Sequence, residues 1–274
     1  MKQFYLWGLG VAVGVGLLVA GVTRYGWHQP QFTKRERAAA PTLVLKGAAV
    51  QGAVLSAADG QGKPLNLKLK TAEVDPKDPA GEIYLYEVLY QNPQTQRWQN
   101  LCQPDHDGVA KALPLSGQWD NQGHYSPQGI TLACTNGALA KCVRWGYKPW
   151  KTDQDIPWRD LHQTCTRMVR ADYCGDGVPH TQPGVAIDIY DRLAIQQRTP
   201  QSGMTFEAAW GPEGAVAIHR TRFPTAMAQV RQQCPERLKP LPSPDANPLT
   251  LQGYAPDALI FNDSFIEPQI SSGP

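Results

Sequence analysis

Most side chains that could carry chemistry lie in one run of the chain, residues 131–191. This run holds four of the six cysteines and three of the eight tryptophans, together with many charged groups. Its centre reads Cys165-Thr-Arg-Met-Val-Arg-Ala-Asp-Tyr-Cys-Gly-Asp-Gly177. Cysteine near histidine suggests nucleophilic catalysis, aspartates near glycine suggest a metal-binding loop, and clustered arginines suggest an anion or glycan surface.

Thiol chemistry would use Cys165 or Cys174 as the nucleophile, with His162 or His180 as its partner. His162 lies three residues before Cys165, so the two share a helical face region where an imidazole could lower the thiol pKa. The competing interpretation is that both cysteines are halves of disulfides. We favour the disulfides and predict no catalytic residue, with a Cys/His hydrolase or transferase of the cell envelope as the alternative.

The metal interpretation is weaker. Counted from Asp172, aspartates and a glycine stand where a calcium loop has them, but its last position is Pro183 instead of a bidentate glutamate. Pairing of Asp172 with Arg167 or Arg170, followed by a turn at residues 176–177, explains the same residues without an ion. We therefore predict neither a metal nor a cofactor.

Two overlapping sets of residues are candidates for a binding surface. The first, called here the motif rim, consists of Arg167, Arg170, Asp172, Asp176 and His180. The second interleaves arginines with tryptophans: Arg144, Arg159, Arg167 and Arg170 with Trp145, Trp150 and Trp158. Arginine forks and aromatic stacking suit an anion or a glycan, but the tryptophans can equally fill a core, which we favour.

The cysteine count indicates disulfides. Six is an even number, and no Cys-x-x-Cys pair of a zinc site occurs. The candidates are Cys102, Cys134, Cys142, Cys165, Cys174 and Cys234. Six cysteines allow 15 connectivities. Cys142 and Cys165 both fall on apolar faces of neighbouring expected helices, so we predict a Cys142–Cys165 bridge.

The elements that must position these residues are short. Apolar or alternating runs predict strands at 43–45, 53–55, 65–69, 82–90, 130–134, 185–190, 205–210 and 215–220. Helical spacing predicts helices over about 136–145, 158–171 and 225–234. We expect an α+β fold of antiparallel sheets and hairpins with two or three short helices, stapled by disulfides. It would span residues 42–239 and be followed by a Pro-rich tail over 240–274, in which 258–261 could dock as an added strand.

The amino-terminal segment predicts a membrane anchor. Residues 4–22 form an uncharged stretch that would span about 28 Å as a helix, close to the thickness of the bilayer core. We assign 1–23 to a transmembrane helix and 24–41 to a polar linker. The alternative is a signal peptide cleaved near Val19-Ala20-Gly21. Arg24 and the later basic residues argue for a cytoplasmic domain, but the cysteines argue for an oxidising exterior and carry more weight.

Composition restricts the partners. Only 18% of the 274 residues are charged and the formal net charge is +2. No extended basic block occurs, so nucleic acid is not expected as a partner. The sequence does not identify a small-molecule ligand.

Two stretches resemble a known family. Residues 133–150 and 165–177 resemble the bacterial ADYC domain family, whose name is spelled here by Ala171-Asp172-Tyr173-Cys174. The resemblance extends from about Thr42 to Cys234. It implies a domain identity and an export or anchor segment, but no mechanism, because the family has no assigned activity.

Together these patterns predict a single-pass protein of a bacterial inner membrane, with its domain in the periplasm or outside the cell, or exported after signal cleavage. Its expected role is non-catalytic binding or assembly, as an accessory subunit of an envelope or membrane complex. The expected partners are the membrane, through residues 4–22, and proteins of such a complex.

Overall fold

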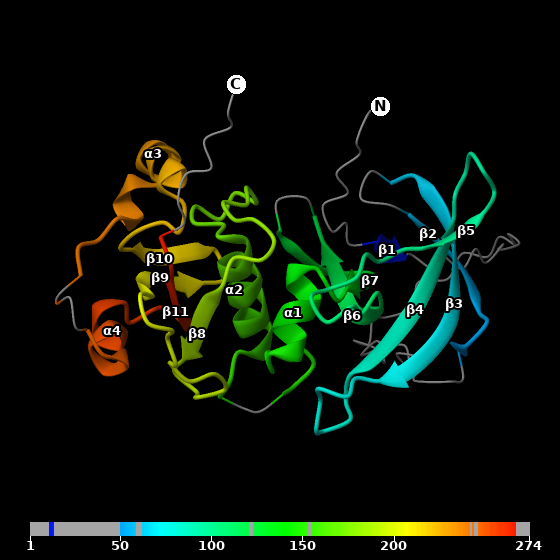
Figure 1. The fold of residues 1–274 in the computed structure, drawn as a ribbon, viewed down its shortest axis with the longest axis horizontal. Coiled ribbons are helices and arrows are strands. Elements are labelled where there is room, and N and C mark those ends of the chain that lie inside the picture. Colours follow the sequence, from blue (N-terminus) through cyan, green and yellow to red (C-terminus); the bar gives the residue numbers. More distant parts are fainter. Residues whose placement is uncertain are drawn as a thin grey trace, which may run out of the picture.

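The computed structural model describes most of the chain beyond residue 49. The described ranges are 11–13, 50–58, 62–120, 123–152, 155–241, 243 and 246–266. Two antiparallel sheets stand on either side of a pair of helices (Figure 1). The expected α+β class with disulfides is therefore confirmed.

The first sheet contains seven strands. They are β1 (Val11–Val13), β2 (Val54–Ala58), β3 (Pro64–Val74), β4 (Tyr84–Gln91), β5 (Trp98–Asn100), β6 (Ala112–Trp119) and β7 (Tyr125–Cys134). Their order is β3-β2-β1-β7-β6-β4-β5, and β3 also pairs with β4. The sheet thus closes on itself, which satisfies backbone groups that an open edge would leave unpaired. β5 is added outside the closed part.

Two helices lie between the sheets. α1 (Ala138–Arg144) packs on the first sheet through Ala140 and Val143, which are both fully buried. α2 (Trp158–Arg170) faces the second sheet, because Leu161, Cys165 and Met168 recur at helical spacing and are all buried. Both helices match their predicted positions to within a few residues.

The second sheet has four strands in the order β10-β9-β11-β8. They are β8 (Ile187–Asp191), β9 (Thr205–Gly211), β10 (Gly214–Ile218) and β11 (Ile260–Ser264). All are antiparallel, and β9 and β10 form the predicted hairpin. α3 (Pro224–Gln233), the short 3-10 helix η2 (Pro235–Arg237) and α4 (Pro248–Tyr254) follow it on the outer side.

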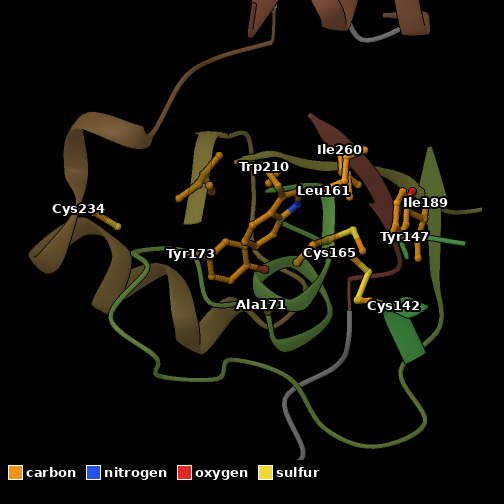
Figure 2. Packing of buried hydrophobic residues seen from close by; sticks show 14 of the residues in the cluster. Cys142, Tyr147, Leu161, Cys165, Ala171, Tyr173, Ile189, Trp210, Cys234 and Ile260 are labelled. Carbon is orange, nitrogen blue, oxygen red and sulfur yellow. A yellow bond between two sulfur atoms is a disulfide. The ribbon is translucent and has the colours of Figure 1, made fainter. Parts of the chain in front are cut away.

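All six cysteines are paired. The bridges are Cys102–Cys134 in the first sheet, Cys142–Cys165 between α1 and α2, and Cys174–Cys234 between the end of α2 and the end of α3. The predicted Cys142–Cys165 bridge is confirmed. Figure 2 shows it within the core, near Leu161 and Trp210. Such bridges are typical of proteins in an oxidising compartment.

Most of the predicted membrane anchor lies outside the described residues. Only Val11–Val13 are described, and they are extended: β1 pairs with β7 on one side and β2 on the other. β1 fills the gap between these two strands. In the part of the chain that the structure describes, no helix is long and apolar enough to cross a bilayer.

The chain after residue 239, predicted as a tail, contributes to the fold, and the added strand suggested at 258–261 is present as β11. β11 lies between β8 and β9, and all five of its residues are buried. Asn262 and Asp263 tolerate this burial because Asn262 accepts from Trp210 Nε1 at 2.7 Å and Asp263 pairs with Arg198 at 2.6 Å. These partners are distant in sequence, so the local pattern could not reveal the strand's central position.

Candidate functional site

The helix-ending motif at residues 171–174 is built into the core. Ala171 ends α2 in the left-handed conformation, with φ of 51°, and is fully buried. Asp172 is also buried, where it pairs with Arg167 and accepts from the backbone N–H of Gly177 at 3.1 Å. The predicted Asp172–Arg167 pair and the turn after the helix are therefore confirmed.

Tyr173 belongs to a fully buried polar network. Its hydroxyl donates to Glu207 Oε1 at 2.9 Å and accepts from the backbone N–H of Arg222 at 3.0 Å. The Arg222 guanidinium pairs with Glu207 at 2.8 Å and also donates to the Met168 carbonyl. Burial would raise the pKa of Glu207, but the Arg222 charge and the hydrogen bonds to the carboxylate together hold that pKa below its usual range. The network therefore ties the end of α2 to β9.

The loop after the motif is fitted closely against the β9–β10 turn. Gly175 has a φ of 75°, and a Cβ there would overlap the carbonyl oxygen of Glu213. Arg237 donates to both the Tyr173 and the Glu213 carbonyls, at 2.9 and 3.0 Å. The neighbouring Cys174–Cys234 bridge fixes the same loop to α3. The motif thus sets the position of the β9–β10 turn.

The motif rim predicted from sequence does not form one exposed surface. Arg167 and Asp172 are buried as a pair, because each satisfies the charge of the other. Arg170 is partly buried and donates to the Gly177 carbonyl, while Asp176 accepts from the backbone of Val178. His180 is also partly buried and lies 5.9 Å from the Tyr173 ring, and burial lowers its pKa. Placing Arg167 and Asp172 on a surface was wrong.

The alternative hypothesis of a cysteine–histidine enzyme needs a free thiol, and neither candidate cysteine has one in this structure. Cys165 is bonded to Cys142 and Cys174 to Cys234. His162 is fully buried, and its Nε2 lies 3.0 Å from the Leu139 carbonyl oxygen. Cysteine nucleophilicity depends on the thiolate, so this chemistry would require reduced protein.

Burial of His162 predicts a specific acid sensitivity. Burial lowers the pKa of His162 to about 4, against an ordinary value near 6.5. The unfolded chain therefore binds a proton at a higher pH than the folded chain does. The free energy of unfolding is unaffected by this group above about pH 6.5 and decreases as the pH drops toward 4. The expected decrease is about 3 kcal/mol.

Urea unfolding of wild type and His162→Gln at pH 7 and pH 4.5 should show a smaller loss in the variant, whereas His106→Gln, at an exposed position, should behave like wild type. Equal losses in all three proteins would contradict the assignment.

A loop in the first sheet gathers metal-type ligands. Potential ligand atoms of Asp105, His106 and Asp107 lie within 4.8 Å of one another. However, Arg144 donates to Asp105 at 2.8 Å and Lys77 pairs with Asp107. Cations of the protein thus already neutralise these carboxylates, and we assign no metal to them.

A polar pocket of about 260 Å³ lies where the β6–β7 turn, α2 and the β9–β10 turn meet. Its lining residues are His124, Tyr125, Arg159, Asp160, Gln163, Arg167, Pro212 and Glu213. Residues 159, 160, 163 and 167 recur along one side of α2, which forms the floor. His124 and Tyr125, at the start of β7, form one wall, and Pro212 and Glu213, between β9 and β10, form the other.

Hydrogen bonds hold these walls to the floor. Gln163 accepts from Trp119 Nε1 at 2.8 Å and donates to the Gly123 carbonyl at 2.7 Å. Arg167 donates to the Pro212 carbonyl at 3.3 Å while it pairs with Asp172 of the motif. The motif at residues 171–174 therefore contacts a pocket residue through Asp172 but does not itself line the pocket.

The sequence identified this site only in part. Of the arginine and tryptophan set, Arg159 and Arg167 reach the pocket, whereas Arg144 pairs with Asp75 and Asp105. Trp158 is buried in the core, as the favoured interpretation predicted, but Trp150 is exposed. His124, Tyr125 and Glu213 were missed, because each lies next to a turn with no local signal of chemistry.

The fold and the pocket define a disulfide-stapled α+β protein in which two antiparallel sheets enclose a helix pair. A family model for the ADYC domain matches residues 47–224, and the chain belongs to this family. The match ends before β11, so the central strand of the second sheet lies beyond it. No curated protein and no solved structure was found to match the chain.

Proposed function

We propose that this protein is a non-catalytic binding module outside the cytoplasm, anchored in the membrane and acting as an accessory subunit of an envelope complex. The observation that carries the proposal is the polar pocket: it is held by all three surrounding elements and presents charged side chains to solvent. A rigid site with a few convergent polar groups is what a binding protein requires.

The disulfides and the apolar amino-terminal segment support the location. Three bridges favour an oxidising compartment, and residues 4–22 have the length and apolar character of an anchor. Insertion of this whole segment into a membrane would withdraw β1 from its pairing with β2 and β7. The anchored form would therefore leave these two strands with unpaired edges.

Site-specific crosslinking combined with intact mass tests the proposal. A photo-crosslinking residue is placed at Glu213, on the pocket wall, in the full-length protein expressed in the envelope. A matched protein carries it at Glu236, which is also exposed but lies on η2. We expect irradiation to add mass at position 213 and not at 236.

The same non-reducing mass reports the other features. We expect the amino-terminal residues to be retained, six hydrogens to be missing because of three bridges, and iodoacetamide to add nothing to the native protein. Rapid alkylation of Cys165 or Cys174 would instead support the thiol enzyme. Equal crosslinking at both positions, or none at either, would remove the basis for a binding site here.

A further inference from the structure

Some charged side chains of the pocket have a partner of opposite charge in the protein, and others do not. Arg167 is buried and paired with Asp172, so its charge is already compensated. Arg159 contacts the Tyr125 ring, but no acceptor among the described residues pairs with its guanidinium. Within the same described part of the chain, neither the Asp160 nor the Glu213 carboxylate forms an ion pair. The pocket therefore offers one available cation and two available anions.

Arg159 is held in a defined orientation. Its guanidinium lies 4.3 Å from the centroid of the Tyr125 ring. That ring is itself fixed: Trp119 contacts it at 5.0 Å, and Gly117 leaves the space it occupies, because a Cβ at 117 would overlap it. A guanidinium stacked in this way keeps its edge N–H groups available, and these match the two oxygens of a carboxylate.

The two carboxylates restrict which anion can bind. Asp160 follows Arg159 on α2, and Glu213 lies on the opposite wall. A ligand with only a carboxylate would be repelled by both acids, and a ligand with only an ammonium group would leave Arg159 unpaired. A neutral sugar would compensate neither charge. The pocket volume, about 260 Å³, is below that of drug-sized sites and suits a small ligand.

We propose that the pocket binds a small zwitterion, of the size of a free amino acid or a dipeptide. Arg159 holds its carboxylate, and Asp160 and Glu213 hold its ammonium group. This inference rests on the proposed function, since it assigns a ligand class to the same pocket.

Four probes test the ligand class by isothermal titration of the full-length protein. Alanyl-alanine carries both charges, its N-acetyl form only the carboxylate, its C-terminal amide only the ammonium group, and maltose neither. We expect alanyl-alanine to bind, the two blocked forms to bind at least about tenfold more weakly, and maltose not to bind. Arg159→Gln should weaken alanyl-alanine binding by about tenfold or more, whereas Arg231→Gln, an exposed arginine on α3, should leave it unchanged.

Each contrary outcome is informative. Blocked dipeptides that bind as well as alanyl-alanine, or binding that survives Arg159→Gln, overturn the zwitterion assignment. Maltose binding that depends on Arg159 overturns it too, but leaves the pocket as a binding site. Absence of binding by every probe, with crosslinking still specific to position 213, likewise removes the ligand class and retains the proposed function.

Discussion

Gly175→Ala should lower the free energy of unfolding by about 2–5 kcal/mol. Residue 175 has a φ of 75°, which costs an alanine about 1–2 kcal/mol, and the new methyl group would overlap the Glu213 carbonyl. Relieving the overlap requires the loop after the motif to move away from the β9–β10 turn. Urea unfolding monitored by tryptophan fluorescence measures the change.

Gly184→Ala is the matched control. Gly184 has a similar φ of 89°, but nothing lies within 4 Å of a Cβ built there. The free energy of unfolding of this variant should therefore decrease only by the cost of a positive φ at an alanine, about 1–2 kcal/mol. If the two variants lose the same stability, the close packing of the motif loop on the turn does not contribute to the fold.

Glu207→Gln is expected to cost about 3–5 kcal/mol. Glu207 is fully buried and compensates the equally buried charge of Arg222, so its neutralisation leaves an unpaired guanidinium in the core. Glu87→Gln serves as the control, since it breaks an exposed pair with Lys70 and should cost at most about 1 kcal/mol.

The double variant Glu207→Leu/Arg222→Met separates charge from packing. Removing both partners eliminates the unpaired charge, so much of the lost stability should return. Chemical denaturation of the single and double variants gives the comparison. A double variant as unstable as Glu207→Gln would show that the hydrogen bonds to Tyr173 and Met168, and not the charge, hold this part of the core.

Helical periodicity explains why one bridge could be predicted. Cys142 and Cys165 each occupy an apolar face of a helix, and this property is contained in a few neighbouring residues. The partners of Cys102 and Cys174 could not be chosen in this way, because 32 and 60 residues separate them from Cys134 and Cys234. Connectivity over such distances depends on how the sheets pack.

The errors at the candidate site have one physical cause. Arg167 and Asp172 look like surface charges in the sequence, but each can be buried because the other neutralises it. Asp263 is likewise buried because the partly exposed Arg198 neutralises it, and this allows β11 to lie inside a sheet. Local polarity therefore underestimated burial at both places.

The sequence did not indicate β5 or β6. By itself, it determined the fold class, the family, helices α1–α3, strands β2–β4 and β7–β10, and the use of cysteines for disulfides. These follow from composition, short-range periodicity and a long motif, all of which are local. The tertiary structure alone decided the insertion of β11, the burial of the motif and the position of the pocket between two turns. Each depends on pairs of residues far apart in the chain, such as Trp119 with Gln163 and Arg167 with Pro212, whose contact no local pattern encodes.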